Sequence, residues 1–379
     1  MKIAIDARMY GLENAGIGRY VTNLVQHLSK IDGKNTYEII LRKKYYDELN
    51  FPNKWRKHLI DDRHYSFKEQ FSLPQLLNKL QPDVTHFPHF NVPVFYQRSY
   101  VVTIHDLSKN RSKGRGSTTL PYPLYWLKRI VYSSVIKRAI HKSKHIIVPT
   151  NFVKRDILAN YHISSEIINV TYEGVETTPG KVNVINKYKV NKPYFIFTGS
   201  AYPHKNLERL VDAIVLLNKQ YELEVDLLIS SSRSVFTERL EKLISEKKAD
   251  SYVKLLGFVP DDELYSLYKN SVAFVYPSLM EGFGLPGLEA MSAGTLVLVS
   301  DIPVFKEVYE KSAKYFNPYD FTSIGRVMKE AFEVKRTERR EIIKRSQSYV
   351  KKYNWEKMAR ETLRVYEQTS SSDESSASL

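Results

Sequence analysis

Short apolar runs alternate with amphipathic stretches along the whole chain. This alternation is typical of strand–helix units that build parallel sheets. In the first half it predicts strands at Lys2–Ile5, Tyr37–Leu41, Val84–Phe87, Tyr100–Ile104 and His145–Pro149. The helices predicted there are Gly18–Lys30, Gln70–Leu80, Tyr122–His141 and Asn151–Tyr161.

The second half repeats the same alternation. Its predicted strands are Tyr194–Thr198, Val225–Ile229, Val253–Leu256, Val272–Val275 and Leu296–Ser300. Its predicted helices are Asn206–Gln220, Ser234–Lys248, Asp261–Asn270, Gly287–Ala293, Ile302–Glu310 and Thr322–Glu333, followed by a charged helical stretch, Arg339–Gln368.

The polar stretch Glu176–Lys192, with a proline and a glycine inside it, separates the two halves. We therefore predict an α/β protein of two Rossmann-like, doubly wound domains, at 1–178 and 190–345, that face each other across a cleft. Residues 346–369 form a final helix, and the serine- and acid-rich residues 370–379 form a disordered tail. Ligands of such sheets bind at the carboxyl ends of strands, at a switch point in strand order.

Charge divides unevenly along the 379 residues. The formal net charge is +15, and residues 1–180 carry 27 Lys and Arg against 15 Asp and Glu, a balance of +12. Twelve basic residues and no acidic ones lie between Leu107 and Arg155, interleaved with Tyr122, Trp126 and other aromatic residues. This surface favours an anionic membrane over a merely solvated face, and nucleic acid comes third because no nucleic-acid motif accompanies the charge.

Several classes of protein are disfavoured. No stretch approaches the roughly 20 apolar residues of a membrane-spanning helix, and the N-terminus reads directly as a strand without a signal-peptide pattern. The chain has no cysteine, which excludes disulfides and thiolate chemistry. These features predict a cytoplasmic protein, peripheral to the inner face of the cell membrane if the basic surface docks there.

The most informative stretch is Glu281-Gly-Phe-Gly-Leu-Pro-Gly-Leu-Glu289. A buried strand precedes it and a helix follows, with Pro286 near the first turn, where its missing N–H costs nothing. A helix N-terminus behind a glycine turn presents N–H groups to an anion, and the two carboxylates can accept hydrogen bonds from hydroxyls. Phosphate and sugar hydroxyls together describe a nucleotide-sugar, although the same spacing also occurs on solvated helices.

Three further loops hold candidate residues. Gly16 and Gly18 precede the first predicted helix, where the backbone can approach a phosphate, but Val21 holds the place of the third glycine of a dinucleotide fingerprint. His105 and Asp106 follow a strand, where an imidazole can meet a developing charge. Lys205 lies at a predicted helix start, where ammonium and helix dipole can neutralise a diphosphate.

No metal spacing is found among the ten histidines, and there is no Asp-x-Asp pair in a suitable loop. A diphosphate site that uses Lys205 and helix dipoles instead of a metal fits this pattern. We therefore expect no cofactor and no metal. The missing glycine and the missing ribose-binding acid after the second strand disfavour an NAD-dependent dehydrogenase.

Taken together, these residues resemble the retaining GT-B glycosyltransferases of family 4, the glycosyl transferases group 1. The resemblance runs from Gly16-Ile-Gly18-Arg19 through Thr103-Ile-His105-Asp106 and Gly199–Asn206 to Glu281–Glu289. Asn354-Trp355 and the following helix look like the family's C-terminal segment, which crosses back to the N-terminal domain. The motif Pro203-His204-Lys205-Asn206 looks most like that of bacterial mannosyltransferases of O-antigen and exopolysaccharide assembly.

The resemblance implies roles for individual residues. His105, Glu281 and Lys205 would be catalytic, with Glu281 on the transferred sugar and Lys205 on the diphosphate, and Asp106 and Tyr10 would contact the acceptor. The residues implied in donor binding are Gly16, Gly18, Arg19, Ser200, Lys205, Gly257, Phe258, Val259, Glu281, Gly282, Phe283, Gly284, Leu285 and Glu289.

One position departs from the family pattern. Many members carry an arginine where this chain has Ser200, which leaves the diphosphate to Lys205, to the Gly284–Gly287 turn or to Arg19. The predicted function is transfer of a hexose, with mannose preferred, from a nucleotide-diphosphate sugar to a glycan or polyprenyl-linked glycan. A sugar-nucleotide epimerase of the same architecture and a non-catalytic basic binding protein remain as alternatives.

Overall fold

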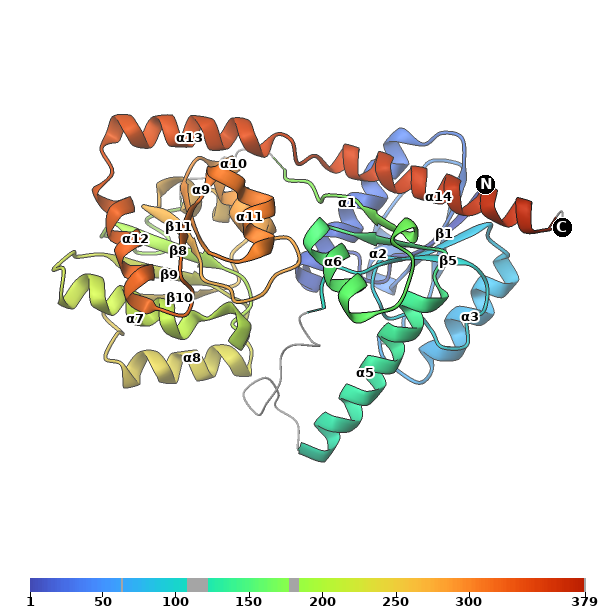
Figure 1. Cartoon of the computed structure of the whole chain (residues 1–379), viewed down its shortest axis with the longest axis horizontal. Coiled ribbons are helices and arrows are strands. Elements are labelled where there is room, and N and C mark those ends of the chain that lie inside the picture. Colours follow the sequence, from blue (N-terminus) through green and yellow to red (C-terminus); the bar gives the residue numbers. More distant parts are fainter. Residues whose placement is uncertain (63, 108–121, 177–183, 378–379) are drawn as a thin grey trace. The chain divides into compact units, whose positions relative to one another are not determined.

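The computed structural model describes residues 1–62, 64–107, 122–176 and 184–377 (Figure 1). These residues form two compact units, which are described separately. Unit 1 contains residues 1–62, 64–107, 122–174 and 354–377, and unit 2 contains residues 175–176 and 184–353.

Unit 1 is built on a parallel sheet whose described strands run in the order β3-β2-β1-β4-β5-β6-β7. The strands are β1 Lys2–Asp6, β2 Thr36–Leu41, β3 Trp55–Leu59, β4 Val84–Phe87, β5 Tyr100–Thr103, β6 His145–Val148 and β7 Ile168–Val170. The helices are α1 Ala15–Ile31, α2 Lys43–Glu48, α3 Glu69–Leu80, α5 Tyr122–Lys142, α6 Asn151–Asn160 and α14 Trp355–Ala377, with short 3-10 turns at Leu12–Asn14 and Ser165–Ile167.

Helix α1 shows how the apolar pattern produces this layer. Val21, Leu24, Val25 and Leu28 are all fully buried and recur at the spacing of one helix face. The helix begins at Ala15, three residues earlier than predicted, so the glycines expected in a loop before the helix lie in its first turn. A helix that starts beside a packed loop can include glycines when tertiary contacts outweigh their low propensity.

The end of the chain belongs to unit 1. Helix α14 packs along α1 and over the central strands (Figure 1), and its Tyr366 hydroxyl hydrogen-bonds to His86 Nδ1 on β4 at 2.6 Å. The predicted continuous helix is instead two helices, because the chain turns after Val350 and the Asn354 side chain accepts a hydrogen bond from Lys357 N as a new N-cap. This confirms the returning C-terminal helix of the predicted fold.

The serine-rich segment was predicted to be disordered from Ser370, but α14 continues to Ala377. Extending an existing helix adds one backbone hydrogen bond per residue without a new nucleation cost. Because the earlier turns of α14 are fixed by buried residues such as Met358 and Tyr366, the polar end propagates from an anchored helix.

Unit 2 holds a second parallel sheet, in the order β10-β9-β8-β11-β12-β13. Its strands are β8 Tyr194–Thr198, β9 Asp226–Ser230, β10 Val253–Gly257, β11 Ala273–Tyr276, β12 Leu296–Ser300 and β13 Lys314–Phe316. Its helices are α7 Leu207–Lys219, α8 Val235–Glu246, α9 Asp261–Asn270, α10 Leu285–Ala293, α11 Pro303–Tyr309, α12 Phe321–Glu333 and α13 Arg336–Val350, with 3-10 turns at Pro203–Lys205 and Glu310–Ser312.

Each sheet has one switch point, and these two points position the candidate residues. In unit 1 the strand order turns back between β1 and β4, and in unit 2 between β8 and β11. Loops that leave the carboxyl ends of such a pair diverge to opposite faces of the sheet and leave room for a ligand. The loop after β8 carries Lys205 and the loop after β11 carries Glu281.

Candidate functional site

Lys205 and Glu281 meet at the switch point of unit 2. Lys205 Nζ lies 2.5 Å from Glu281 Oε1, and each side chain is 13% exposed. The ammonium also stands 5.5 Å from the centre of the Tyr276 ring at the end of β11. Burial raises the pKa of Tyr276 well above its usual value, and the hydrogen bond and charge of Glu281 raise it further. The site thus holds one cation and one anion that a polar ligand can reach.

The two loops that carry this pair are joined by backbone and side-chain hydrogen bonds. Leu279 N donates to His204 O at 2.8 Å. The buried Asn206 amide donates to Pro277 O at 3.0 Å and to Pro318 O at 2.8 Å. Asn206 has φ +59°, a left-handed conformation that asparagine tolerates better than most residues. The positions of Lys205 and Glu281 are therefore fixed by this network.

Tyr309 explains why Gly284, just before α10, and Gly287, inside α10, are both glycine. Its hydroxyl donates to Gly284 O at 2.5 Å. A Cβ at Gly284 would lie 2.6 Å from the Tyr309 hydroxyl and 2.9 Å from Phe305, and one at Gly287 would lie 2.3 Å from that hydroxyl. Gly284 also has φ +110°, which side-chain-bearing residues rarely adopt. Both positions require glycine because the buried Tyr309 occupies the space that a side chain would fill.

The rest of the predicted donor segment has the expected local structure. Helix α10 begins at Leu285, two residues before the predicted start at Gly287, with Pro286 in its first turn, and Glu289 lies half-buried inside it. Gly282 and Phe283 are buried. Glu281 in the turn and Glu289 in the helix thus come from the same strand–turn–helix element.

The other predicted donor residues of unit 2 also follow strand ends. Gly199 and the exposed Ser200 follow β8. Gly257 ends β10 with φ +73°, and a Cβ there would meet no atom within 4 Å. Phe258 is 64% exposed whereas Val259 is buried, so the two neighbours face opposite environments.

Three hydroxyls near these strand ends lack a hydrogen-bond partner among the described residues. They belong to Thr198 at the end of β8, Ser231 after β9 and Ser278 after β11. The three strands are neighbours in the sheet. Buried polar atoms normally have partners, so a polar ligand or water at this edge of the sheet would satisfy them.

His105 in unit 1 is held by two acceptors. Its Nδ1 lies 3.1 Å from Glu173 Oε1 and its Nε2 lies 3.0 Å from Pro88 O. The Tyr20 ring packs edge-on against the imidazole at 4.8 Å. Burial would lower the pKa of His105, but the hydrogen bond and charge of Glu173 outweigh it and raise the pKa above 6.5. The arrangement favours an imidazolium with both N–H groups engaged.

We expect Glu173→Gln to lower the pKa of His105, because the amide removes the charge that stabilises the imidazolium. The histidine Cε1–H signal, followed by NMR against pH, measures this pKa directly. A raised folded-state pKa stabilises the fold fully below the unfolded pKa, about 6.5, and this contribution disappears as pH rises through the folded pKa. The loss of unfolding free energy in the variant should therefore be larger at pH 6 than at pH 9.

The exposed Glu166 provides the matched control for this experiment, since Glu166→Gln removes one carboxylate from the same unit without touching His105. A His105 signal that titrates below pH 6.5 in the unmodified protein, or that ignores Glu173→Gln, would contradict the assigned cause.

The remaining predicted residues of unit 1 divide by accessibility. Gly16 is exposed and a Cβ there would meet no atom, whereas Gly18 is buried and its Cβ would lie 1.9 Å from Gly11 O. Gly18 is thus required by packing against the loop after β1. Arg19 follows in the same helix and is half-buried.

The two residues predicted to contact the acceptor also differ. Asp106 is half-buried beside His105. Tyr10 is only 5% exposed, and its hydroxyl accepts a hydrogen bond from Gln26 while its ring packs on Tyr45 at 4.9 Å. Tyr10 therefore makes internal contacts in this structure.

Comparison with known sequences identifies the family. Residues 182–349 match the sequence family Glycosyl transferases group 1, and residues 14–178 match the sequence family Glycosyltransferase Family 4. The O-antigen chain mannosyltransferase RfbU of Salmonella typhimurium is 30% identical over 270 residues, 71% of this chain and 69% of that protein. The chain belongs to the family 4 glycosyltransferases. A second relative of this glycosyltransferase, the Escherichia coli O-antigen chain mannosyltransferase B, is 28% identical over 296 residues, 75% and 74% of the two chains.

Solved structures share its fold. WaaG, a glycosyltransferase involved in lipopolysaccharide biosynthesis, gives a TM-score of 0.72 at 13% identity, covering 96% of this chain and 98% of that one. A glycosyltransferase from Rickettsia africae gives a TM-score of 0.71 at 19% identity, and the match covers 97% of this chain and 98% of that one. At such identities the likeness concerns the fold, which is GT-B with its two parallel-sheet units.

The glycosyltransferase site contains residues that sequence reasoning missed. Glu173 and Tyr309 each contact a predicted site residue from a distant part of the chain, and Asn206, next to Lys205, joins the Lys205 loop to the loop after β11. Asn206 alone gave a local signal, because asparagine before a helix is a common cap and tolerates positive φ. Glu173 and Tyr309 gave none, since their contacts depend on which strands and helices become neighbours.

Proposed function

We propose that this glycosyltransferase transfers mannose, with retention of configuration, from GDP-mannose to a hydroxyl of a glycan or polyprenyl-linked glycan. The Lys205–Glu281 pair at the switch point of unit 2 carries the proposal. The mannose assignment draws support from relatives named as O-antigen chain mannosyltransferases. Retention follows from the resemblance to the retaining members of family 4.

Lys205 has the chemistry to stabilise the departing diphosphate. Its side chain is only 13% exposed, so the charge of its ammonium is screened less than that of a surface lysine. The N-terminus of α10 adds backbone N–H groups at the same end of the sheet. Departure of the diphosphate leaves an oxocarbenium-like sugar, which the acceptor hydroxyl attacks from the same face, with the leaving phosphate as base. Glu281 accepts hydrogen bonds from the sugar, and Glu289 from the ribose of the nucleotide.

Calorimetric titration of GDP and UDP into the protein, beside Lys205→Ala and Glu289→Ala, tests the donor site. Micromolar binding of GDP that both substitutions weaken is the expected result. A preference for UDP would mean that the donor is a UDP-sugar instead of GDP-mannose. Binding of neither nucleotide would contradict the transferase proposal and favour a non-catalytic binding protein. Conversion of GDP-mannose to another nucleotide sugar without an acceptor would identify an epimerase.

The reaction should not need a divalent metal, because Lys205 and the helix N-terminus supply the charge that a metal would otherwise supply. We expect dialysis against EDTA to leave the transfer rate within about twofold. The measurement compares treated enzyme with and without added Mg²⁺ or Mn²⁺. Loss of activity that returns with one of these ions would contradict the expectation.

We also propose that helix α5 docks on an anionic membrane, which would place the enzyme at the cytoplasmic face. In the described part of the chain, no helix is long and apolar enough to cross a membrane. The exposed side of α5 instead carries apolar residues among lysines and arginines; the apolar ones are Leu124, Trp126, Leu127, Ile130 and Val131. Residues 108–121, which contribute to the predicted basic surface, lie outside the described residues.

Trp126 reports on this contact, since it is 44% exposed while Trp55 and Trp355 are buried. Anionic vesicles should shift the fluorescence emission of Trp126 to the blue, and brominated lipid chains in those vesicles should quench it. Neutral vesicles should cause neither change. Each basic residue near such a surface contributes about 1 kcal/mol, so Lys128→Glu with Lys137→Glu should weaken binding more than tenfold. Lys79→Glu on α3 is the control, and binding that ignores lipid charge would contradict the proposal.

A further inference from the structure

Arg233 lies in the short loop between β9 and α8, at the carboxyl edge of the unit 2 sheet. It is exposed, and it forms no hydrogen bond or ion pair with any other residue that the structure describes. Between the strands β8 to β13 and the α-helices that follow them, all of which the structure describes, Lys205 and Arg233 are the only lysine and arginine. Because Lys205 is paired with Glu281, Arg233 is the cation of this edge that remains available to a ligand.

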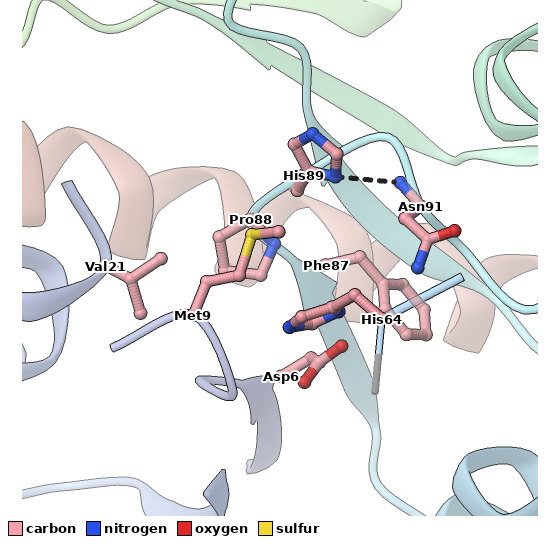
Figure 2. Close-up of a pocket in the computed structure, with 8 residues that line it drawn as sticks. All are labelled: Asp6, Met9, Val21, His64, Phe87, Pro88, His89 and Asn91. Carbon is pink, nitrogen blue, oxygen red and sulfur yellow. Dashed lines mark hydrogen bonds between the residues drawn. The ribbon is translucent and has the colours of Figure 1, made fainter. Parts of the chain in front are cut away.

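The arginine beside the switch point of unit 1 is already engaged by other groups. A small hollow lies there between β1 and β4, with Asp6 among its lining residues (Figure 2). Arg8 is buried, and its guanidinium donates to both oxygens of Asp6 at 2.7 Å and to Glu69 Oε1 at 2.6 Å. Arg8 therefore stabilises unit 1 internally, whereas the exposed guanidinium of Arg233 keeps its N–H donors for a ligand.

The loop of Arg233 has a fixed backbone. Ser234 is the N-cap of α8, and its side chain accepts a hydrogen bond from Thr237 N at 3.3 Å while Thr237 Oγ1 accepts one from Ser234 N at 2.7 Å. This reciprocal pair is a capping box. On the other side of Arg233, Ser231 N donates to Gly257 O at 3.0 Å. The backbone is thus held on both sides of Arg233, so less conformational entropy is lost when its side chain binds a ligand.

This loop packs beside the loop that carries Lys205. Strands β8 and β9 are paired in parallel, so their carboxyl ends lie side by side. The rings of Tyr202 and Phe236 are in contact, with centroids 4.8 Å apart, and they join the Lys205 loop to the first turn of α8. A ligand whose diphosphate lies on Lys205 can therefore extend past the end of β8 toward Arg233.

Glu289 indicates which part of a nucleotide reaches Arg233. This step rests on the proposed function, in which Glu289 accepts a hydrogen bond from the ribose. Helix α10, which carries Glu289, packs against α9, the helix that follows β10. Strand β9 lies between β8 and β10 in the sheet. A ribose on Glu289 thus directs its base toward the ends of β9 and β10, where Arg233 and the exposed Phe258 lie.

We propose that Arg233 recognises the base of the donor nucleotide by donating two parallel hydrogen bonds to N7 and O6 of guanine. The guanidinium presents its N–H groups as a planar fork, and guanine offers two adjacent acceptors on one edge. Uracil offers a single acceptor on the corresponding edge, and adenine has an amino donor beside N7. Arg233 therefore selects GDP over UDP and ADP.

Nucleotide analogues test this contact atom by atom. Calorimetry compares GDP, inosine diphosphate, 7-deaza-GDP, UDP and inorganic pyrophosphate on the unmodified full chain and on Arg233→Ala. Inosine diphosphate keeps N7 and O6 and should bind like GDP, whereas 7-deaza-GDP lacks the N7 acceptor and should bind more weakly. Arg233→Ala should weaken binding of GDP and inosine diphosphate about 10- to 100-fold, as expected for one bidentate contact, and leave UDP and pyrophosphate within about twofold.

Arg233→Lys separates the shape of the guanidinium from its charge, because an ammonium has no planar fork. This variant should bind GDP as weakly as Arg233→Ala does. Arg340→Ala is the matched control, since Arg340 is an exposed arginine of α13 at the opposite edge of the same sheet. The preceding Arg339 marks that edge, because its guanidinium donates to Val272 O at 2.7 Å, just before β11 begins. The control should change none of these affinities.

The outcomes separate this inference from the proposed function. Equal losses of GDP, UDP and pyrophosphate binding in Arg233→Ala, or full recovery of GDP binding in Arg233→Lys, overturn the base contact and assign Arg233 to the diphosphate. GDP binding that is unchanged in Arg233→Ala also overturns the inference, while weaker binding in Lys205→Ala still supports the donor site. Binding of neither GDP nor UDP by the unmodified protein would count against the function itself.

Discussion

Replacing Lys205 with alanine should reduce kcat for sugar transfer by about 10²- to 10³-fold, the range for removing one group that stabilises transition-state charge. Nucleotide diphosphate binding should weaken as well, since a hydrogen bond to a charged group contributes about 1.5–3 kcal/mol. The loss is enlarged because Glu281, now 13% exposed beside Lys205, would face the diphosphate without its partner. Single-turnover rates and calorimetry measure the two effects separately.

Glu281→Gln separates charge from position at this pair. The amide removes a negative charge from the diphosphate site and releases the ammonium that Glu281 holds at 2.5 Å. We therefore expect GDP affinity to be maintained or increased while transfer slows. Lys219→Ala, at the exposed end of α7, is the matched control and should change neither quantity. Equal losses from Lys219→Ala and Lys205→Ala would show that only general surface charge matters.

Gly284→Ala should lower the free energy of unfolding by about 2–5 kcal/mol. The left-handed backbone at φ +110° contributes about 1–2 kcal/mol of this with a side chain present. Overpacking against the Tyr309 hydroxyl at 2.6 Å contributes about 1–3 kcal/mol. Urea unfolding monitored by circular dichroism gives the difference, and reduced transfer by the remaining folded enzyme would report the displaced turn.

Two other glycines of unit 2 separate these contributions. Gly257 has φ +73° but open space around a Cβ, so Gly257→Ala should cost only about 1–2 kcal/mol, from the backbone. A Cβ at Gly287 would lie 2.3 Å from Tyr309 Oη, and Gly287 has no positive φ, so Gly287→Ala should reveal the steric contribution alone. Tyr309→Phe should partly rescue Gly284→Ala, and no rescue would place the strain elsewhere.

The elements that the sequence predicted well are those with strong local patterns. Strands β8 and β11 are nearly continuous apolar runs, and the sequence predicted the ends of each to within one residue. Strand β3, Trp55–Leu59, was missed because Arg56, Lys57 and His58 interrupt it, as an edge strand allows. Strands β7 and β13 were missed because three residues are too short for any period.

The residues of the candidate site that were predicted correctly also belong to local sequence patterns. Glu281 and Glu289 belong to one strand–turn–helix element, so their spacing was visible in the sequence. The exit of Lys205 and His105 from strand ends was visible too, because a strand followed by a helix marks a loop in any parallel sheet. These local patterns predicted the fold class, and with the family resemblance they predicted the enzyme class.

Only the tertiary structure decided which of these residues have partners. Lys205 and Glu281 are 76 positions apart, and His105 and Glu173 are 68 apart. Their pairing depends on strand order, because β8 lies beside β11, and β5 beside β6, which in turn pairs with β7. Strand order results from the packing of the whole sheet, whereas hydrophobic periodicity describes only neighbours along the chain. The sequence therefore determined which groups are present at the strand ends, and the fold determined their contacts, burial and protonation.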